Sequence, residues 1–511
     1  MAGCVQVDVV VVGGGPVGLV VAAELAAFGV RAMVIEARRG VSRRPKATTL
    51  HARTVQSLVR RGLLEGVGGG GSSRGVVSAP FHFAGIPGLA IRVPAAEPAP
   101  VVKCPQDVLE GLVERRARAV GVRVLRGYEV TEVCESSGGV RVRARGVGGE
   151  VVCRAAYVVG ADGARSTVRE QSSFSSAGFA ATVSALAGDV RLVGGADVVQ
   201  GWQRTPRGWI VAKQVEEGWT RLRTVEWAVP QGGREREVTL EELRGRVSSI
   251  AGRQVGMEGA RWLSRFSDYA RLVNSYRSGR VLLAGDAAHV HFPIGGQGLS
   301  TGLLDAVNLG WKLAFTVRGV AGGGLLDTYD LERRPAAQRV IDNTRAQVAL
   351  MRPDPALDPL RALFGELVGG GGESSVLGSM ISAQDTVLPV GEGGGGGGGA
   401  ACEGVFLPNV PLVTAGGSTD VIGLLRGGRP LLLMFGRGGA GFAEQARGWS
   451  GAVRVVRAEP VPEMACGALL VRPDGYVAWS SCGGAELEEV LAAYFGPGVP
   501  ARVGVGVSAG G

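Results

Sequence analysis

A glycine-rich turn between a buried strand and a helix constrains the fold of this 511-residue chain more than any other feature. Four valines, Val9–Val12, run directly into the turn at 13–18, and an amphipathic helix is predicted over Leu19–Phe28. In such a turn, glycines allow the bend, let backbone N–H groups approach a pyrophosphate, and let the helix pack on the strand. A second predicted strand, Val30–Ile35, ends in Glu36, whose carboxylate can hold ribose hydroxyls. We therefore predict a Rossmann-like domain that binds an ADP-containing dinucleotide.

Two later segments place a Gly-Asp motif at the end of a predicted strand. Asp162 follows the predicted strand Ala156–Val159, and Asp286 follows the predicted strand Arg280–Ala284. A single motif of this kind is most often only a turn. Two of them, in this order behind a dinucleotide turn, indicate FAD rather than NAD as the bound dinucleotide.

With these segments in place, the chain resembles the group A FAD-dependent aromatic hydroxylases, which share a p-hydroxybenzoate hydroxylase-like fold. The resemblance covers about Val7 to about Ser480, is most specific in Ser275–Leu313, and points to the branch that oxidises aromatic polyketides and related antibiotics. It implies that Asp162 lies near both the FAD pyrophosphate and the nicotinamide cofactor. It also implies that Asp286 accepts hydrogen bonds from the ribityl chain of the flavin.

The same resemblance implies further cofactor contacts. Gln106, at the start of the predicted helix Gln106–Ala119, would contact the ribityl or adenosine part of FAD, and Arg44 is the arginine we favour for reaching the anionic cofactors. A loop before the predicted helix Thr301–Val317 would follow the isoalloxazine ring, where a helix N-terminus stabilises the anionic reduced flavin. The predicted cofactor-binding residues are Gly13, Gly15, Pro16, Val17, Gly18, Glu36, Ala37, Arg44, Gln106, Asp162, Asp286, Pro293, Gly296, Gly298, Leu299 and Ser300.

Three positions depart from the pattern of the family. Ser300 stands where the family usually has Asn, Leu304 where it has Gln, and Lys46 where it has Arg. Ser300 can still make one hydrogen bond, so flavin binding should survive with altered redox tuning. Lys46 keeps the positive charge but loses the two-pronged grip of a guanidinium.

The expected fold is α/β, with a discontinuous GR2-type FAD-binding domain, an inserted and mostly antiparallel β-sheet substrate domain, and a thioredoxin-like C-terminal domain. The last lacks a C-x-x-C motif, so we expect it to serve stability or assembly rather than thiol chemistry. The predicted boundaries are 1–75, 98–178 and 268–350 for the FAD-binding domain, 76–97 and 179–267 for the substrate domain, 351–392 for a helical connection, 393–399 for a glycine linker and 400–496 for the C-terminal domain.

Aromatic residues on predicted strands of the substrate domain are candidates for the substrate pocket. They are Phe81, Phe83, Trp209 and Trp227, although aromatic residues on a sheet more often belong to its core. In the family this sheet forms the floor of the pocket, across the isoalloxazine ring.

The function implied by the resemblance is an FAD-dependent monooxygenase. NADPH or NADH would reduce FAD, O₂ would add to give the C4a-hydroperoxide, and an electron-rich phenolic ring of a polyketide or antibiotic would take one oxygen atom. The chemistry lies on the flavin, so no catalytic side chain is assigned, although His289 and His291 could act as an acid or base.

Other readings share these motifs. Baeyer–Villiger oxygenation of a polyketide ketone, hydroxylation followed by ring or linker cleavage, and flavin binding without turnover all stay open. Flavin halogenation is disfavoured because the chain has no W-x-W-x-I-P segment.

Composition excludes several other classes of function. The formal charge of +9 is dispersed along the chain, which disfavours a nucleic-acid partner. The seven cysteines are scattered, so neither a disulfide framework nor a metal site is expected. With no apparent signal peptide or membrane span, we expect a cytoplasmic enzyme with a small aromatic substrate. The predicted helix Leu326–Met351 could supply the surface of a homodimer.

Overall fold

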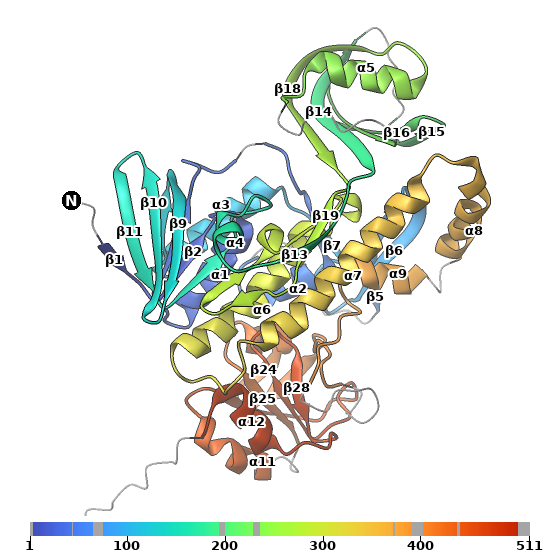
Figure 1. Cartoon of the computed structure of the whole chain (residues 1–511). Helices are drawn as coiled ribbons and strands as arrows, with labels where there is room; N and C mark the ends of the chain where they lie inside the picture. The colour runs from blue at the N-terminus through green and yellow to red at the C-terminus, as the bar shows by residue number, and fades with distance from the viewer. Residues whose placement is uncertain are drawn as a thin grey trace, which may run out of the picture.

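The computed structural model describes residues 4–42, 44–64, 75–193, 200–227, 236–370, 374–390, 402–436 and 440–498. The predicted linker at 393–399 therefore lies outside the described residues. Three regions follow one another from top to bottom in Figure 1: a β-sheet region around β14 (Val183–Val193) and β18 (Gly256–Ser267), a central α/β region, and a C-terminal region.

The central region is built on a six-stranded sheet in which five neighbouring strands are parallel and one edge strand is antiparallel. The four valines of β2 are at most 4% exposed, as expected for a parallel strand covered on both faces. Helix α1 (Pro16–Ala27) packs against α3 (Gln106–Ala119) and α6 (Gly298–Val317). The strand order is β20 (Arg277–Ser278), β21 (Val281–Leu283), β12 (Tyr157–Gly160), β2 (Val9–Val12), β3 (Ala32–Glu36) and β8 (Arg123–Arg126).

The register of this sheet brings the three sequence motifs to one edge. Val12, the last residue of β2, lies opposite Gly160 of β12 and Ile35 of β3. Gly160 in turn lies opposite Leu283 of β21. The carboxyl ends of parallel strands are where α/β sheets bind ligands, so the turns that follow these strands can act on one ligand.

The second region is a five-stranded antiparallel sheet covered on one face by α5 (Leu240–Ala251). Buried side chains such as Leu186, Ile210 and Leu222 fill the space below α5, which leaves the alternate residues to form the opposite face. The strand order is β15 (Gly201–Thr205), β16 (Gly208–Glu216), β17 (Trp219–Trp227), β14 (Val183–Val193) and β18 (Gly256–Ser267).

The C-terminal region packs on α6 through a mixed sheet and the closing helix α12 (Leu487–Phe495). Trp311 and Phe315 of α6 join one hydrophobic cluster with Leu491 and Phe495 of α12. The sheet contains β24 (Gly417–Asp420), β23 (Pro411–Thr414), β26 (Arg454–Ala458), β25 (Leu431–Phe435), β27 (Ala468–Val471) and β28 (Val477–Ser480), in that order.

Four charged side chains, which we call the interface cluster, are buried where the C-terminal region meets α6 and α7 (Thr328–Met351). Lys312 lies 2.7 Å from Glu332, and Arg472 lies 2.8 Å from Glu332 and 2.6 Å from Asp474. All four side chains are at most 3% exposed. Two cations and two carboxylates therefore balance one another inside the protein.

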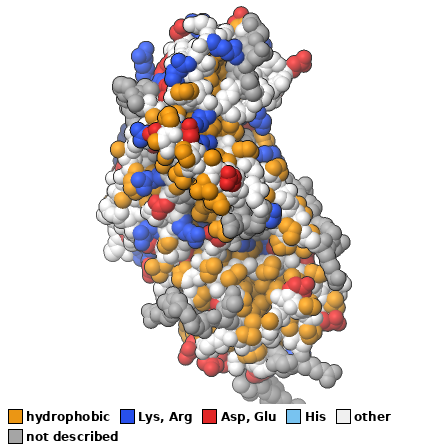
Figure 2. Space-filling view, turned by 90° about the vertical axis from the view of Figure 1, so that its right-hand side faces the viewer, with side chains coloured by type: hydrophobic (Ala, Val, Ile, Leu, Met, Phe, Trp, Pro, Cys, Tyr) orange, Lys and Arg blue, Asp and Glu red, His pale blue; other side chains and the backbone are white. Residues whose placement is uncertain are grey.

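The remaining elements surround these regions. Figure 2 looks onto the face that carries α8 (Asp358–Gly369), where hydrophobic side chains gather. Leu360, Leu363 and Leu367 of α8 are 48%, 54% and 45% exposed.

No helix in the described ranges is both long and apolar enough to cross a membrane. The remaining strands are β1 (Cys4–Gln6), β4 (Thr49–His51), β5 (Val76–Phe83), β6 (Ile86–Pro94), β7 (Val101–Lys103), β9 (Tyr128–Ser136), β10 (Gly139–Gly146), β11 (Gly149–Ala155), β13 (Ser176–Phe179), β19 (Ala270–Val273) and β22 (His289–Val290). The remaining helices are α2 (Ala52–Arg60), α4 (Thr167–Gln171), α8 (Asp358–Gly369), α9 (Ser374–Ile381), α10 (Val421–Leu425) and α11 (Ala440–Gln445).

Candidate active site

A cavity of about 1860 Å³ extends from the carboxyl edge of the parallel sheet to the open face of the antiparallel sheet. Pockets for one drug-sized ligand hold roughly 300–1,000 Å³, so this cavity has room for more than one molecule. Its walls include most of the predicted cofactor-binding residues: Gly13, Gly15, Pro16, Val17, Glu36, Ala37, Gln106, Asp162, Asp286, Pro293, Gly296, Gly298 and Leu299.

Among the glycines at 13–18, only Gly15 has open space in the direction that a Cβ atom would take. Gly13 has φ +105°, and a Cβ there would lie 2.3 Å from the Ala161 carbonyl oxygen. A Cβ on Gly18 would lie 2.0 Å from the Gly13 carbonyl oxygen, so Gly18 serves helix packing and does not line the cavity. A Cβ on Gly15 would meet nothing within 4 Å. Gly15 caps α1 without a side-chain hydrogen bond, so the helix N-terminus opens onto free space suited to a pyrophosphate.

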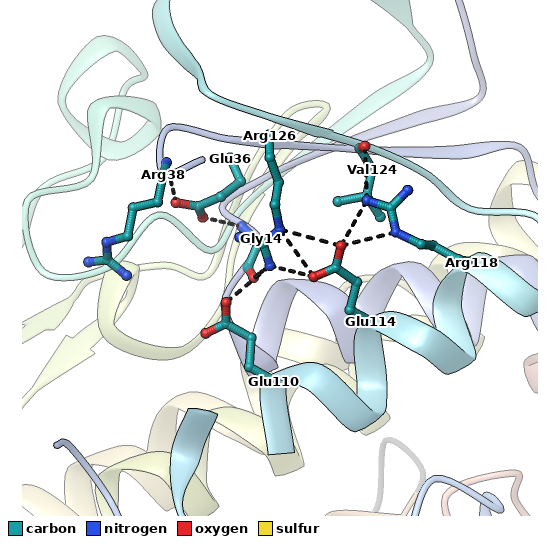
Figure 3. A network of polar contacts seen from close by, with 8 residues as sticks. All are labelled: Gly14, Glu36, Arg38, Glu110, Glu114, Arg118, Val124 and Arg126. Atoms are coloured by element: carbon teal, nitrogen blue, oxygen red, sulfur yellow. Dashed lines mark hydrogen bonds and ion pairs between the residues drawn. The ribbon is translucent and has the colours of Figure 1, made fainter. Parts of the chain in front are cut away.

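A polar network fixes the residues beside this turn (Figure 3). The Glu36 carboxylate accepts hydrogen bonds from the Gly14 N–H at 2.6 Å and the Arg38 N–H at 2.8 Å. Arg126 on β8 contacts Glu110 at 3.0 Å and Glu114 at 2.6 Å, both on α3. Arg126 also donates to the Gly14 carbonyl at 3.5 Å, so these contacts join α3 and β8 to the turn. The sequence analysis missed them, because β8 and the glutamates of α3 meet only in the folded chain.

The two Gly-Asp motifs place their carboxylates differently. Asp162 accepts a hydrogen bond from the Val168 N–H at 3.2 Å and so helps to start α4, while its other oxygen has no partner in the described part of the chain. The Asp286 side chain is open to the cavity. Burial away from water raises the pKa of both carboxyls. At Asp286, His289 and Lys46 partly oppose this rise.

Buried contacts of Asp305 fix the backbone near the loop that precedes α6. Asp305 accepts hydrogen bonds from the Gly285 N–H at 3.1 Å and from Arg333 at 2.9 Å, and it contacts His289 at 2.8 Å. His289 is therefore a structural partner of Asp305, which fixes the backbone next to Asp286.

Three histidines near the cavity have pKa values of about 4 because burial disfavours the charged imidazolium: His51, His82 and His291. The His291 Nδ1–H donates to the Phe292 carbonyl at 2.9 Å, which leaves its Nε2 as an acceptor without a partner in the described chain. His291 lines the cavity, whereas His289 does not.

Some sequence predictions need correction. Ser300 is buried, where its hydroxyl accepts the His51 N–H at 3.3 Å, and Arg44 is exposed away from the cavity. On the same segment, Arg38 and Lys46 line the cavity instead. Leu304 is buried beside a small void next to Asp474.

Of the four predicted pocket aromatics, only Phe81 lines the cavity. Phe83 stacks on Phe364, and Trp209 is 2% exposed and donates its indole N–H to the Met351 carbonyl at 2.7 Å. Trp227 packs, half-buried, against the same core. Trp209 and Trp227 lie outside the cavity because α7 and the β5–β6 hairpin cover the end of the sheet that carries them. Phe83 belongs to the hairpin itself and packs against Phe364.

Other aromatic residues take their place. Trp202, Trp262 and Phe266 line the cavity from β15 and β18. No strand was predicted at these residues, and only their aromatic side chains could have indicated them.

Comparison with known proteins decides the family. The family model described as FAD binding domain matches residues 6–344, and the one described as aromatic-ring hydroxylase, C-terminal, matches residues 400–498. The chain belongs to the FAD-dependent aromatic-ring hydroxylases. The 12-dehydrotetracycline 5-monooxygenase/anhydrotetracycline 6-monooxygenase of Streptomyces rimosus is 37% identical to this hydroxylase over 96% of its chain and 99% of the relative.

Two other comparisons show the range of the family. The structure of an anhydrotetracycline hydroxylase from Streptomyces rimosus is 35% identical, with a TM-score of 0.86, covering 97% of this hydroxylase and 100% of that chain. The dialkyldecalin synthase of Streptomyces rugosporus is 39% identical over 96% of this chain and 99% of the relative.

The family membership confirms the predicted FAD-dependent monooxygenase, with NAD(P)H and O₂ as co-substrates. The residues present fit FAD, because the space at Gly15 and the open carboxylate of Asp286 meet in one cavity. No grouping of three or more possible metal-ligating side chains occurs within the described ranges.

Proposed function

We propose that this hydroxylase adds one oxygen atom to a planar phenolic ring of the polyketide or antibiotic type. The single observation that carries the proposal is the continuous cavity, which joins the dinucleotide turn to a sheet face bearing aromatic side chains. Relatives that are monooxygenases of tetracycline intermediates support the same substrate class.

The proposed roles of this chain's residues follow from their positions. The N-terminus of α1 and Gly15 would bind the pyrophosphate, and Glu36 would exchange its bond to Gly14 for the ribose hydroxyls. Asp286 would hold the ribityl chain, and the first N–H groups of α6 would face the pyrimidine end of the flavin. Bound FAD supplies the redox chemistry, taking a hydride from NAD(P)H and activating O₂.

The other end of the cavity would orient the substrate and exclude water. Phe81, Trp202 and Trp262 offer faces and edges for an aromatic ring, which prefers stacked or edge-on contact. The sheet and the α6 loop would then hold the ring against the flavin, where an oxygen atom can reach it. The partner is thus a small aromatic molecule; homodimer formation and a cytoplasmic location stay predictions.

A second candidate is ring formation without net oxidation, with FAD as a fixed part of the site. The specific observation behind it is the 39% identity to a dialkyldecalin synthase. It differs from flavin binding without turnover, because the protein would still convert a substrate.

The test is NADPH and NADH consumption under air by the FAD-loaded protein, with and without a panel of polycyclic phenols and naphthoquinones. Hydroxylation predicts strong stimulation by one class of compound and a product heavier by one oxygen. A gain of one oxygen with conversion of a ketone to an ester would indicate Baeyer–Villiger chemistry. A product of unchanged mass, formed equally without NAD(P)H, would favour the second candidate.

A further inference from the structure

The open face of the antiparallel sheet carries several cations, of which one is paired with a carboxylate among the described residues. Arg221, Arg223 and Lys213 share this face, since Arg221 lies opposite Lys213, and Arg223 is two residues further along β17. Lys103 of β7 lines the same part of the cavity. Of these four cations, Arg221 is paired with Asp189 by two hydrogen bonds of 2.7 and 2.9 Å.

Arg223 differs from Arg221 although only one residue separates them. Its cross-strand neighbours are Val211 and Ala187, which offer no acceptor side chain. It has no hydrogen bond or ion pair with any residue that the structure describes. Burial and the adjacent Arg221 lower the pKa of Arg223, and Asp189 only partly opposes them. A guanidinium is nonetheless always charged near neutral pH, so an unpaired charge faces the cavity.

Lys213 and Lys103 add to this charge. Lys213 has no ion-pair partner in the described chain, and Lys103 donates to the Thr49 hydroxyl at 3.0 Å. Burial lowers the pKa of Lys103, and the nearby Lys213 lowers it further. We call Arg223, Lys213 and Lys103 the cavity cations.

The carboxylates of the cavity lie elsewhere. Those that line it are Glu36, Glu129, Asp162 and Asp286, on or next to the strands of the central region. Lys46 interacts with Asp286, Glu110 and Glu36, whereas the charged groups that act on Arg223 among the described residues are Arg221 and Asp189. The cavity cations therefore belong to the substrate end, away from the charges around the dinucleotide turn.

We infer that the aromatic substrate is an anion, and that Arg223 determines specificity by binding its anionic oxygen. This inference rests on the proposed function and names the substrate class more narrowly: a ring system with a carboxylate or an ionised phenol or enol. Trp202, Trp262 and Phe266 contact the rings while Arg223 forms charge-assisted hydrogen bonds with the oxygen. The ligand charge then supplies the neutralisation that Asp189 gives to Arg221.

The test is equilibrium dialysis of matched anionic and neutral probes against the FAD-loaded protein, without NAD(P)H so that nothing turns over. The carboxylate arm compares 3-hydroxy-2-naphthoate with its methyl ester. The phenol arm compares alizarin, ionised in mildly alkaline buffer, with its dimethyl ether. The wild type should bind the anion of at least one pair about tenfold or more tightly than the neutral form, and the arm that responds identifies the source of the charge.

Variants assign the effect to one residue. Arg223→Gln should remove about tenfold or more of the affinity for the anion while changing that for the neutral probe less than about twofold. Arg223→Lys should retain part of the preference. Arg191→Gln is the matched control, because Arg191 is exposed on β14 and contacts the Trp219 ring outside the cavity.

Equal binding of both members of each pair by the wild type would overturn the inference, as would equal loss of both in Arg223→Gln. If Arg223→Gln did not fold, the decline of the wild-type preference with added salt would decide, since salt screens a charge contact and not a shape contact. The proposed function fails separately: a protein that prefers anions but never oxygenates an aromatic compound would contradict the function and leave this inference standing.

Discussion

The interface cluster and the cavity cations are both groups of charges removed from bulk water, yet they differ in how they are balanced. In the interface cluster, Arg472 and Lys312 meet two carboxylates within 2.8 Å. In the cavity, Arg223 forms no ion pair with a described residue, and its one carboxylate neighbour, Asp189, is hydrogen-bonded to Arg221. Removing a charge from water is costly unless it is paired, so the balanced group can serve the fold, whereas the unbalanced group indicates a ligand. The difference separates structural charge from functional charge within one molecule.

The pairing is visible in the proton affinities of the interface cluster. Burial alone would raise the pKa of Glu332, but Arg472 and Lys312 lower it to about 2. Burial lowers the pKa of Lys312 to about 8 despite the attraction of Glu332. The cluster therefore stays charged at neutral pH and links the C-terminal region to α6, the helix that begins at the cavity.

The largest expected effect comes from placing a side chain in the space beside the dinucleotide turn. Gly15 has φ −76° and ψ 176°, which any residue adopts, and its Cβ direction is open. Gly15→Val should therefore fold but lose FAD, by about 100-fold or more in affinity if the side chain blocks the pyrophosphate contacts. The measurement is flavin content after purification together with the melting temperature.

Gly40→Val is the matched control for this substitution. Gly40 also has open space around its Cβ direction but lies outside the cavity. Full flavin content in Gly15→Val would show that the turn does not bind the dinucleotide.

The interface cluster should respond through stability. Arg472→Met leaves Glu332 and Asp474 buried with too few partners, so it should lower the free energy of unfolding by about 3–5 kcal/mol. Urea unfolding would measure this. Arg447→Met, which breaks an exposed pair with Glu444, should cost at most about 1 kcal/mol. Similar losses in both variants would contradict the structural role of the cluster.

As pH falls, the histidines near the cavity should lower the free energy of unfolding before Glu332 of the interface cluster does. His51, His82 and His291 stay neutral in the folded protein down to about pH 4, whereas the unfolded chain takes up their protons below about pH 6.5. The unfolded state then binds more protons, so stability falls as pH falls from about 6.5 toward 4. The loss should be about 1 kcal/mol per histidine at about pH 5.5. Glu332, with its pKa lowered to about 2, keeps its contribution until pH falls below 4.5.

Urea unfolding at pH 7 and 5.5 measures the loss, and His82→Phe assigns it. His82 stacks between Phe81 and Trp202, and its Nδ1 is buried without a partner in the described chain, so Phe should fit there. The variant should lose about a third less stability than the wild type over this pH range. An identical loss would show that His82 is not held neutral.

The smallest effect should come from removing a cavity cation. Arg223→Met removes a charge that has no ion pair among the described residues. It relieves the repulsion with Arg221 and gives up only the attraction to Asp189, which Arg221 already pairs, so stability should stay the same or rise by up to about 1 kcal/mol. Urea unfolding of the FAD-loaded variant beside Arg472→Met gives the direct comparison. A loss as large as that of Arg472→Met would mean that Arg223 supports the fold.

The sequence predicted the parts of this structure that depend on local pattern. The valine run, the glycine turn and the two Gly-Asp motifs placed four of the six strands of the central sheet to within a few residues, whereas β8 and β20 were not predicted. The helix Gln106–Ala119 was predicted with its observed bounds. The fold class and the FAD-dependent monooxygenase family are confirmed. These features could be predicted because each motif determines its own backbone geometry.

The substrate end was less predictable because it depends on tertiary packing. Trp209 and Val211 are two residues apart on β16, so their side chains lie on the same face of the sheet. Only Val211 reaches the cavity, because Met351 of α7 covers Trp209. Arg221 and Arg223 likewise share one face of β17, and nothing in the sequence shows that Asp189 pairs with only one of them. Two arginines on one face of a strand were nevertheless a readable signal.

The most direct test of the account is turnover of a polycyclic phenol by the FAD-loaded protein under ¹⁸O₂ with NADPH, followed by mass spectrometry of the product. The account predicts that the product gains one ¹⁸O atom, that the gain requires NADPH, and that Gly15→Val gives none. A product that carries no ¹⁸O, or that forms equally without NADPH and O₂, would contradict it.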